Sequence, residues 1–199
     1  MQKVIVSSLF ICCLFYLVSC KKDDAVNPPV NNLIGNYKFI SLDALTISTV
    51  VIFDGTTTDK TITRSAYTTK NNTGSLAIGA TTMASTDISY QVDTTAMTDF
   101  YEDGVLVDTQ EIPFAADIPA SSATSEYKLV SNDSLYFPTG SAFYGGTTTA
   151  TAPGGAHFRM EGDKLFFTAT KTQVTHNDQP GISMTVTDNA SVIATYQKQ

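Results

Sequence analysis

The chain has 199 residues, 42% of them hydrophobic and 16% charged, and its formal net charge is −7. This composition excludes a disordered or collagen-like chain, and the acidic balance argues against nucleic-acid binding, which needs a basic face. Threonine is unusually frequent, with 30 residues beside 9 Tyr, 11 Phe and no Trp. Because β-branched and aromatic side chains suit a pleated, half-buried surface, the composition favours β structure.

The first twenty residues have the pattern of a secretory signal. Lys3 precedes an almost unbroken apolar run from Val4 to Val18, which fits the charged and apolar regions of a signal peptide. The run is shorter than the roughly 20 residues that a membrane-spanning helix needs. The residues Leu17 to Cys20 resemble a bacterial lipobox, in which the cysteine is acylated and the signal is cut just before it. We therefore expect a signal peptide over residues 1–19 and a lipid anchor on Cys20.

The predicted lipidation accounts for all three cysteines. Cys12 and Cys13 leave with the signal and Cys20 is consumed as a thioether, so the mature chain should contain no free thiol. Thiol catalysis, thiolate metal sites and disulfides are then excluded, although the compartment would permit disulfides. Residues 20–32 are polar, contain a Pro pair and have no hydrophobic period, which predicts a lipidated tether.

Four charged residues directly follow the predicted lipid attachment site. Lys21, Lys22, Asp23 and Asp24 resemble the surface-export signal of lipoproteins in one Gram-negative phylum, the Bacteroidota. The resemblance implies an outer-membrane lipoprotein that is carried to the cell surface. The alternative is a solvated, charged start of the tether that carries no address.

Residues 33–199 are expected to form a single β-domain, which is long enough for one sizeable core. Apolar and polar residues alternate with a period of two in several runs, most cleanly at 87–93 and also at 47–53, 165–169, 182–186 and 192–196. Turn signals separate the runs at Asp54-Gly55, Asn71 to Gly74, Asp103-Gly104, Asn132-Asp133, Glu161 to Asp163 and Asp188-Asn189. The pattern predicts about ten to twelve strands, with at most a short helix near 94–101 or 114–124.

Consecutive hairpins imply antiparallel pairing, with one face of each strand on a core. An up-and-down barrel and a two-sheet β-sandwich both satisfy this pattern. The opening Gly35-Asn36-Tyr37 and the ending Ala190 to Gln199 resemble the first and last strands of lipocalin-like domains in surface lipoproteins of the same phylum. In that family an aromatic residue two places after the glycine plugs the barrel base, and here it is Tyr37 instead of the usual Trp. The resemblance implies a lipocalin-like barrel whose first strand lies beside its last.

No set of residues with catalytic spacing stands out, so neither enzyme activity nor a cofactor is expected. His157 falls in an alternating run with Phe158 on the opposite face, which is typical of a polar or rim position on a sheet. His176 and Asp178 lie in a predicted long turn and could supply two metal ligands, but zinc sites need three or four. The chain has no Gly-x-Ser-x-Gly elbow.

Other stretches carry weaker signals for ligands or modification. The Gly-rich residues 140–155 lack the ending of a phosphate loop and are expected to form a long hairpin loop, in which Phe143 and Tyr144 could touch a ligand. Asp54 and Asp59 flank a predicted hairpin turn that has too few acidic positions for a calcium loop. Asp93-Thr94-Thr95 and Asp133-Ser134-Leu135 resemble O-glycosylation sites of exported proteins in this phylum.

These patterns predict an outer-membrane β-domain, held to the membrane by its N-terminal lipid only, that binds something rather than transforms it. The first hypothesis is a barrel that holds a small apolar or amphipathic molecule in its interior. The second is a structural or adhesion module that binds a protein or glycan at the cell surface. A hydrolase is a minor alternative. An empty interior would favour the first hypothesis, and a packed core with an exposed aromatic patch would favour the second.

Overall fold

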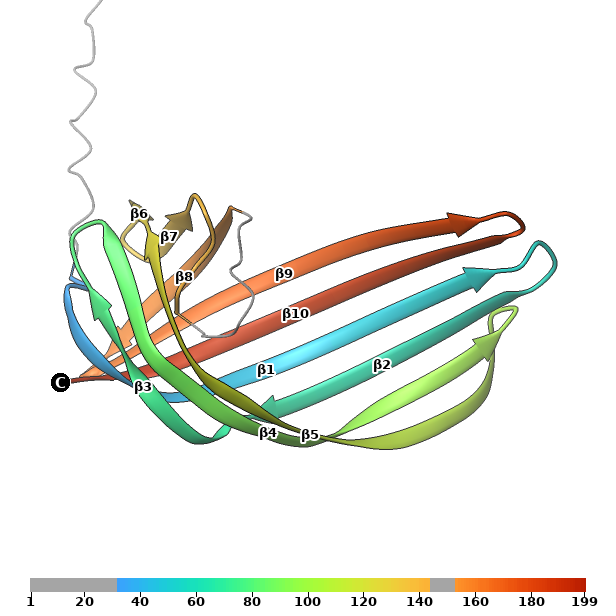
Figure 1. Ribbon diagram of the computed structural model, residues 1–199, viewed down its shortest axis with the longest axis horizontal. Helices are drawn as coiled ribbons and strands as arrows, with labels where there is room; N and C mark the ends of the chain where they lie inside the picture. Colours follow the sequence, from blue (N-terminus) through green and yellow to red (C-terminus); the bar gives the residue numbers. More distant parts are fainter. Residues whose placement is uncertain (1–31, 144–152) are drawn as a thin grey trace, which may run out of the picture.

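The computed structural model describes residues 32–143 and 153–199, and the regular elements of that part are all β-strands (Figure 1). The strands are β1 (Gly35–Phe53), β2 (Thr58–Thr68), β3 (Lys70–Ile78), β4 (Thr82–Glu102), β5 (Val105–Glu126), β6 (Lys128–Ser131), β7 (Ser134–Phe137), β8 (Gly154–Glu161), β9 (Lys164–Gln179) and β10 (Ile182–Lys198). The all-β prediction is confirmed. The short helices considered near 94–101 and 114–124 are wrong, because 94–101 lies in β4 and pairs with 106–114 of β5, and 114–124 lies in β5 and pairs with 84–94 of β4.

The strands pair antiparallel, as the hairpin pattern predicted, and the first lies beside the last, as the resemblance of the chain ends implied. β10 lies between β1 and β9 and pairs with both over nearly its whole length, so that Phe39 opposes Tyr196 and Leu42 opposes Ala194. β1 also pairs with β3 near its start and with β2 over its second half, and β4 pairs with β2, β3 and β5. β5 leads through Tyr127 into β6, which pairs with β7, and β8 connects β7 to β9.

Most predicted turns join strands, but two are wrong. Asn71 to Gly74 form an irregular part of β3. Gly74 has a φ of +103° and passes so close to β4 that a Cβ would lie 2.7 Å from the backbone oxygen of Asp87, so this position requires glycine. Asp188 and Asn189 lie inside β10, opposite β1. A polar pair is tolerated there because neither residue is buried.

The hydrophobic core occupies the end of the molecule where β1 starts and β10 ends. Its largest fully buried aromatic side chains are Tyr37, Phe39, Phe137, Phe143, Phe167 and Tyr196. The Tyr196 hydroxyl donates a hydrogen bond to the backbone oxygen of Phe143, and burial raises the pKa of this phenol. Aromatic side chains that pack against one another contribute more to stability than their buried area alone, so this cluster stabilises the packed end.

Long hairpins carry the sheet well beyond this core. We call residues 46–68 of β1 and β2, 91–118 of β4 and β5, and 169–191 of β9 and β10 the sheet extension (Figure 1). Across it the strands follow the order β9, β10, β1, β2, β4, β5. In its β1, β9 and β10 parts no side chain is buried on either face. Along these three strands the sheet is therefore a single layer with water on both sides.

Candidate functional site

The aromatic residue that the resemblance assigned to the base lies at one end of the core. Tyr37 is fully buried, and its hydroxyl donates a hydrogen bond of 2.8 Å to the backbone oxygen of Leu33. Burial raises the pKa of this phenol. A Cβ on Gly35 would lie 3.5 Å from the Tyr37 ring and 3.4 Å from the Lys198 side chain. Gly35 and Tyr37 therefore pack together where the first and last strands meet.

Phe143 lies in the core and not in a solvent-open loop, which corrects the sequence expectation. Its side chain is fully buried, with its ring centroid 5.6 Å from that of Phe137 and 4.9 Å from that of Phe167. The ring is therefore closed off from solvent and packs inside the core. Tyr144 lies outside the described residues.

His157 lies on the exposed face of β8 and Phe158 on the buried face, as the alternation predicted. The Nδ1 atom of His157 lies 2.9 Å from the Ser134 hydroxyl, which also donates to the Asp133 carboxylate at 2.8 Å. Hydrogen bonds from Ser131 and Ser134 lower the pKa of Asp133. In a catalytic triad the carboxylate orients the histidine, whereas here it contacts the serine. The cluster therefore lacks the order of contacts that activates a serine.

His176 lies within β9 and not in a long turn, which corrects the sequence expectation. Its Nδ1 atom lies 3.0 Å from the Thr185 hydroxyl on β10. Asp178, the other ligand considered, follows two residues later on the same strand. Across residues 32–143 and 153–199, no three His, Cys, Asp or Glu side chains are placed to hold a metal ion.

The predicted anchor and export residues lie outside the described part of the chain. They are the signal at 1–19, Cys20 and the charged residues Lys21, Lys22, Asp23 and Asp24. Within residues 32–143 and 153–199 there is no helix long and apolar enough to span a membrane. In both glycosylation-like sites the hydroxyl group is hydrogen-bonded within the protein. The Ser134 hydroxyl contacts Asp133 and His157, and the Thr94 hydroxyl donates to the Ala66 backbone oxygen at 3.1 Å.

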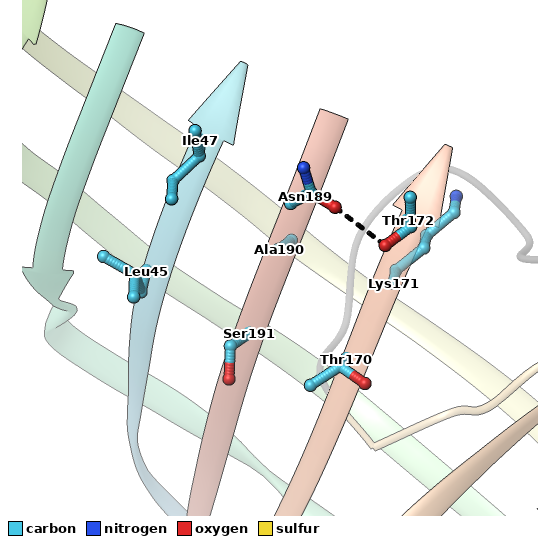
Figure 2. A pocket seen from close by; sticks show the side chains of 8 residues that line it. All are labelled: Leu45, Ile47, Thr170, Lys171, Thr172, Asn189, Ala190 and Ser191. Atoms are coloured by element: carbon cyan, nitrogen blue, oxygen red, sulfur yellow. Dashed lines mark hydrogen bonds between the residues drawn. The ribbon is translucent and has the colours of Figure 1, made fainter. Parts of the chain in front are cut away.

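An open hollow lies on one face of the sheet extension, over β1, β10 and β9 (Figure 2). It is lined by Leu45, Ile47, Thr170, Lys171, Thr172, Asn189, Ala190 and Ser191. Two apolar side chains of β1 line one side of the hollow, and mostly polar side chains of β9 and β10 line the other. Among these, Thr172 donates a hydrogen bond of 2.7 Å to Asn189 (Figure 2). The volume is about 240 Å³, below the roughly 300–1,000 Å³ of typical ligand pockets. The hollow therefore fits a contact surface better than an enclosed ligand.

The far end of the extension exposes large apolar side chains on three hairpins. Phe53 at the end of β1 is 44% exposed and Ile182 at the start of β10 is 48% exposed. Val105, Leu106 and Val107 at the start of β5 are each more than half exposed. Figure 1 places the three hairpin tips at the same end of the molecule. Exposed apolar side chains gathered in one region mark interaction surfaces.

Acidic side chains accompany this apolar tip. The Asp54 carboxylate accepts hydrogen bonds from the backbone N–H groups of Thr57 and Thr56, which lowers the pKa of Asp54 to about 2. Asp103, in the turn between β4 and β5, accepts a hydrogen bond from the backbone N–H of Thr58 at the start of β2, which links the β4–β5 hairpin to the β1–β2 hairpin. The tip therefore presents negative charge beside apolar surface at neutral pH.

The sequence reasoning did not identify the extension as a surface. One signal was available, because residues 50–53 and 105–107 are consecutive apolar residues, whereas a strand with one solvated face alternates. No family model matches the chain, and no curated protein and no solved structure matches it significantly. The candidate site is therefore interpreted from its own geometry.

Proposed function

We propose that the protein is a lipid-anchored module of the outer membrane whose sheet extension binds a protein or glycan at the cell surface. The observation that carries this proposal is the set of exposed apolar side chains at the tip of a sheet extension that lies beyond the core. Burial of apolar surface is the main stabilising term in folding. Strands that served stability alone would gain little by continuing past the core, so a binding role accounts for their length.

The packed end is, in this proposal, a lipocalin-like up-and-down barrel. Two features support it over a two-sheet sandwich. The first is that β1 pairs with β10. The second is that β5, which pairs with β4, continues through Tyr127 into β6, which pairs with β7. In an up-and-down barrel each strand has a neighbour on both sides. The Tyr127 hydroxyl, which donates to the Gly79 backbone oxygen at 2.7 Å, braces this crossover.

The filled interior favours a partner bound at the surface over a small ligand held inside. The rings of Phe143, Phe167 and Tyr196 fill the core, which weakens the hypothesis of a molecule held inside. The exposed aromatic Phe53 and the apolar side chains around it supply the surface that the second hypothesis requires. The Ser134–His157 contact gives no support to a hydrolase, so the module is proposed as a non-enzyme. The acidic tip would be repelled by anionic lipid headgroups, which attract basic segments.

The proposal is tested on intact cells with a photo-cross-linking amino acid. At Phe53 or Ile112 (43% exposed, on β5) it should form adducts of higher mass, because these positions lie in the extension. At Val130, which is 62% exposed on β6 at the packed end, it should form few. Equal adducts at all three positions, or none at Phe53 and Ile112, would contradict a binding role for the extension.

Surface display is tested separately. Replacement of Lys21, Lys22, Asp23 and Asp24 by alanine should keep the lipid but turn the protein inward. Protease added to intact cells should then cleave the original protein and spare the variant. Equal cleavage of both forms would show that these charges are only a solvated start of the tether.

A further inference from the structure

One long edge of the sheet extension has no partner strand within the described part of the chain. β9 pairs with β8 only as far as Thr168, which opposes His157. From Ala169 to Gln179 β9 pairs with β10 on one side, and no described strand pairs with its other side. A sheet edge of this kind presents backbone N–H and C=O groups that can template another strand.

The opposite edge of the extension is guarded against such pairing more strongly than the β9 edge is. In the extension β5 carries one proline, Pro113, three acidic residues between 108 and 117, and no Lys or Arg at all. Proline removes a donor from the edge, and repeated like charge repels a second copy of the same strand. Over residues 169–179, β9 has no proline, and its formal charges are those of Lys171 and Asp178. The β9 edge therefore carries less of the usual protection than the β5 edge does.

The backbone direction of β9 identifies which residues face the open edge. The Phe158 N–H donates to Asp133 on the β7 side at 2.7 Å, so the neighbouring His157 turns its backbone groups toward Thr168 of β9. Because these directions alternate along a strand, the residues of β9 that turn N–H and C=O toward the open edge have even numbers. They are Thr170, Thr172, Val174, His176 and Asp178.

We propose that β9 of a second copy of this chain occupies this edge, antiparallel and centred on Val174. The inference rests on the proposed function and names a partner for the extension. In this register Val174 opposes the partner's Val174, Thr172 opposes the partner's His176, and Thr170 opposes the partner's Asp178. All five residues whose backbone groups turn toward the open edge then exchange hydrogen bonds with the partner strand. A register centred one residue away would bring fewer of these five residues into such pairs. Such a self-complementary contact closes as a two-fold dimer.

The side chains along the edge favour a second copy as the occupant. Lys171 opposes the partner's Asn177, and Asp178 opposes a threonine, so no like charges meet although the chain carries a net charge of −7. Val174 is 52% exposed in the single chain, and in the dimer the partner's Val174 covers it. Directly opposed side chains on one face of an antiparallel pair stabilise it. The two extensions thus continue as one sheet across the dimer axis.

Cysteine cross-linking of the full-length protein in intact cells tests this register. Residues that form a hydrogen-bonded pair have Cα atoms about 5.5 Å apart, within the roughly 4.4–6.8 Å range of disulfides. Val174→Cys should therefore shift to a disulfide dimer of twice the monomer mass on a non-reducing gel after mild oxidation. Thr170→Cys is the matched control on the same strand and face. Its copies would lie eight residues apart along the pair, about 27 Å, and should stay monomeric.

Two further variants secure the interpretation. Adding Asp178→Cys to Thr170→Cys should restore the dimer, because these two positions oppose each other in the register. Adding Thr172→Pro to Val174→Cys should abolish it, since this proline removes an N–H that faces the open edge and leaves the β10 side intact. A monomeric Val174→Cys protein, or equal dimers for the Val174 and Thr170 variants, would overturn the inference. Photo-adducts at Phe53 with a monomeric Val174→Cys protein would overturn the dimer and leave the proposed function standing, whereas loss of both would overturn both.

Discussion

Replacement of Phe143 by alanine tests whether this residue belongs to the core or to a ligand-binding loop. The ring is fully buried between Phe137 and Phe167. Truncation of a buried Phe costs about 3–5 kcal/mol through lost transfer free energy and the cavity left behind. With a urea m value of about 2 kcal/mol per M, the unfolding midpoint should fall by roughly 2 M. Since domains are stable by only about 5–15 kcal/mol, the variant should retain its fold with a small margin.

The assay is urea unfolding of the chain from residue 21 onward, followed by far-UV circular dichroism because the protein has no Trp. Phe114→Ala is the matched control, since this side chain is 51% exposed on β5. It should lose less than about 1 kcal/mol. A Phe143→Ala protein that unfolds at the original urea concentration, or equal losses for both variants, would refute the core assignment and return Phe143 to the surface.

Three other predictions address the anchor, the sheet and one turn. Cys20→Ala should remain unacylated and uncleaved and should leave the detergent phase of outer-membrane extracts; unchanged partitioning would refute the lipoprotein prediction. A chain that ends at Asn189 should show no cooperative unfolding transition, because it lacks Tyr196 and the half of β10 that joins β1 to β9; a melting curve like that of the intact chain would remove support for a closed barrel. For Asp54, the folded-state pKa of about 2 lies below the ordinary value, so its contribution to stability is present above about pH 4 and lost as the pH falls toward 2. The difference in stability between the original protein and Asp54→Ala should therefore be constant from pH 5 to 7 and shrink progressively as the pH falls from 4 to 2, and a constant difference throughout would refute this role.

The strands could be predicted because they depend on local pattern, and one long-range contact was implied by the resemblance of the two chain ends. Both segments with clean alternation, 88–92 and 192–196, lie in strands, β4 and β10. At 88–92 the alternation reflects one buried face, whereas at the end of β10 Thr195 is buried as well as Ala194 and Tyr196. The pairing of β1 with β10 was implied by the resemblance of the two chain ends to lipocalin-like strands, and it leaves neither end of the chain as an exposed edge. Local signals succeed where a strand packs on the core, since burial then selects one side-chain type for each face.

The same rules failed along the sheet extension. Asp188, Asn189 and the residues around His176 have the composition of turns, yet they lie in β10 and β9. Where both faces of a strand meet water, nothing selects against polar residues, and backbone pairing with the neighbouring strand decides the conformation. Pattern reasoning assumes one buried face for every strand, so it mistook strands without one for turns.

The burial of Phe143 could not be predicted because it depends on distant residues. The local sequence Gly140 to Tyr144 has small residues beside aromatic ones, which suits a mobile loop as well as a core contact. Phe143 is placed by its contacts with Phe137, Phe167 and Tyr196, which lie on β7, β9 and β10. An aromatic residue in a Gly-rich segment is therefore assigned only when the whole fold is known.

The single-layer extension has a consequence for how stability changes with temperature. Unfolding usually raises the heat capacity by about 12–15 cal/mol/K per residue, because it exposes apolar surface to water. Strands that already meet water on both faces expose little more when they unfold, although they contribute their share of backbone hydrogen bonds. The heat capacity change per residue should thus be smaller than usual, and the curve of stability against temperature correspondingly flat. A protein built in this way would lose little stability on cooling, when burial of apolar surface becomes a weaker driving force.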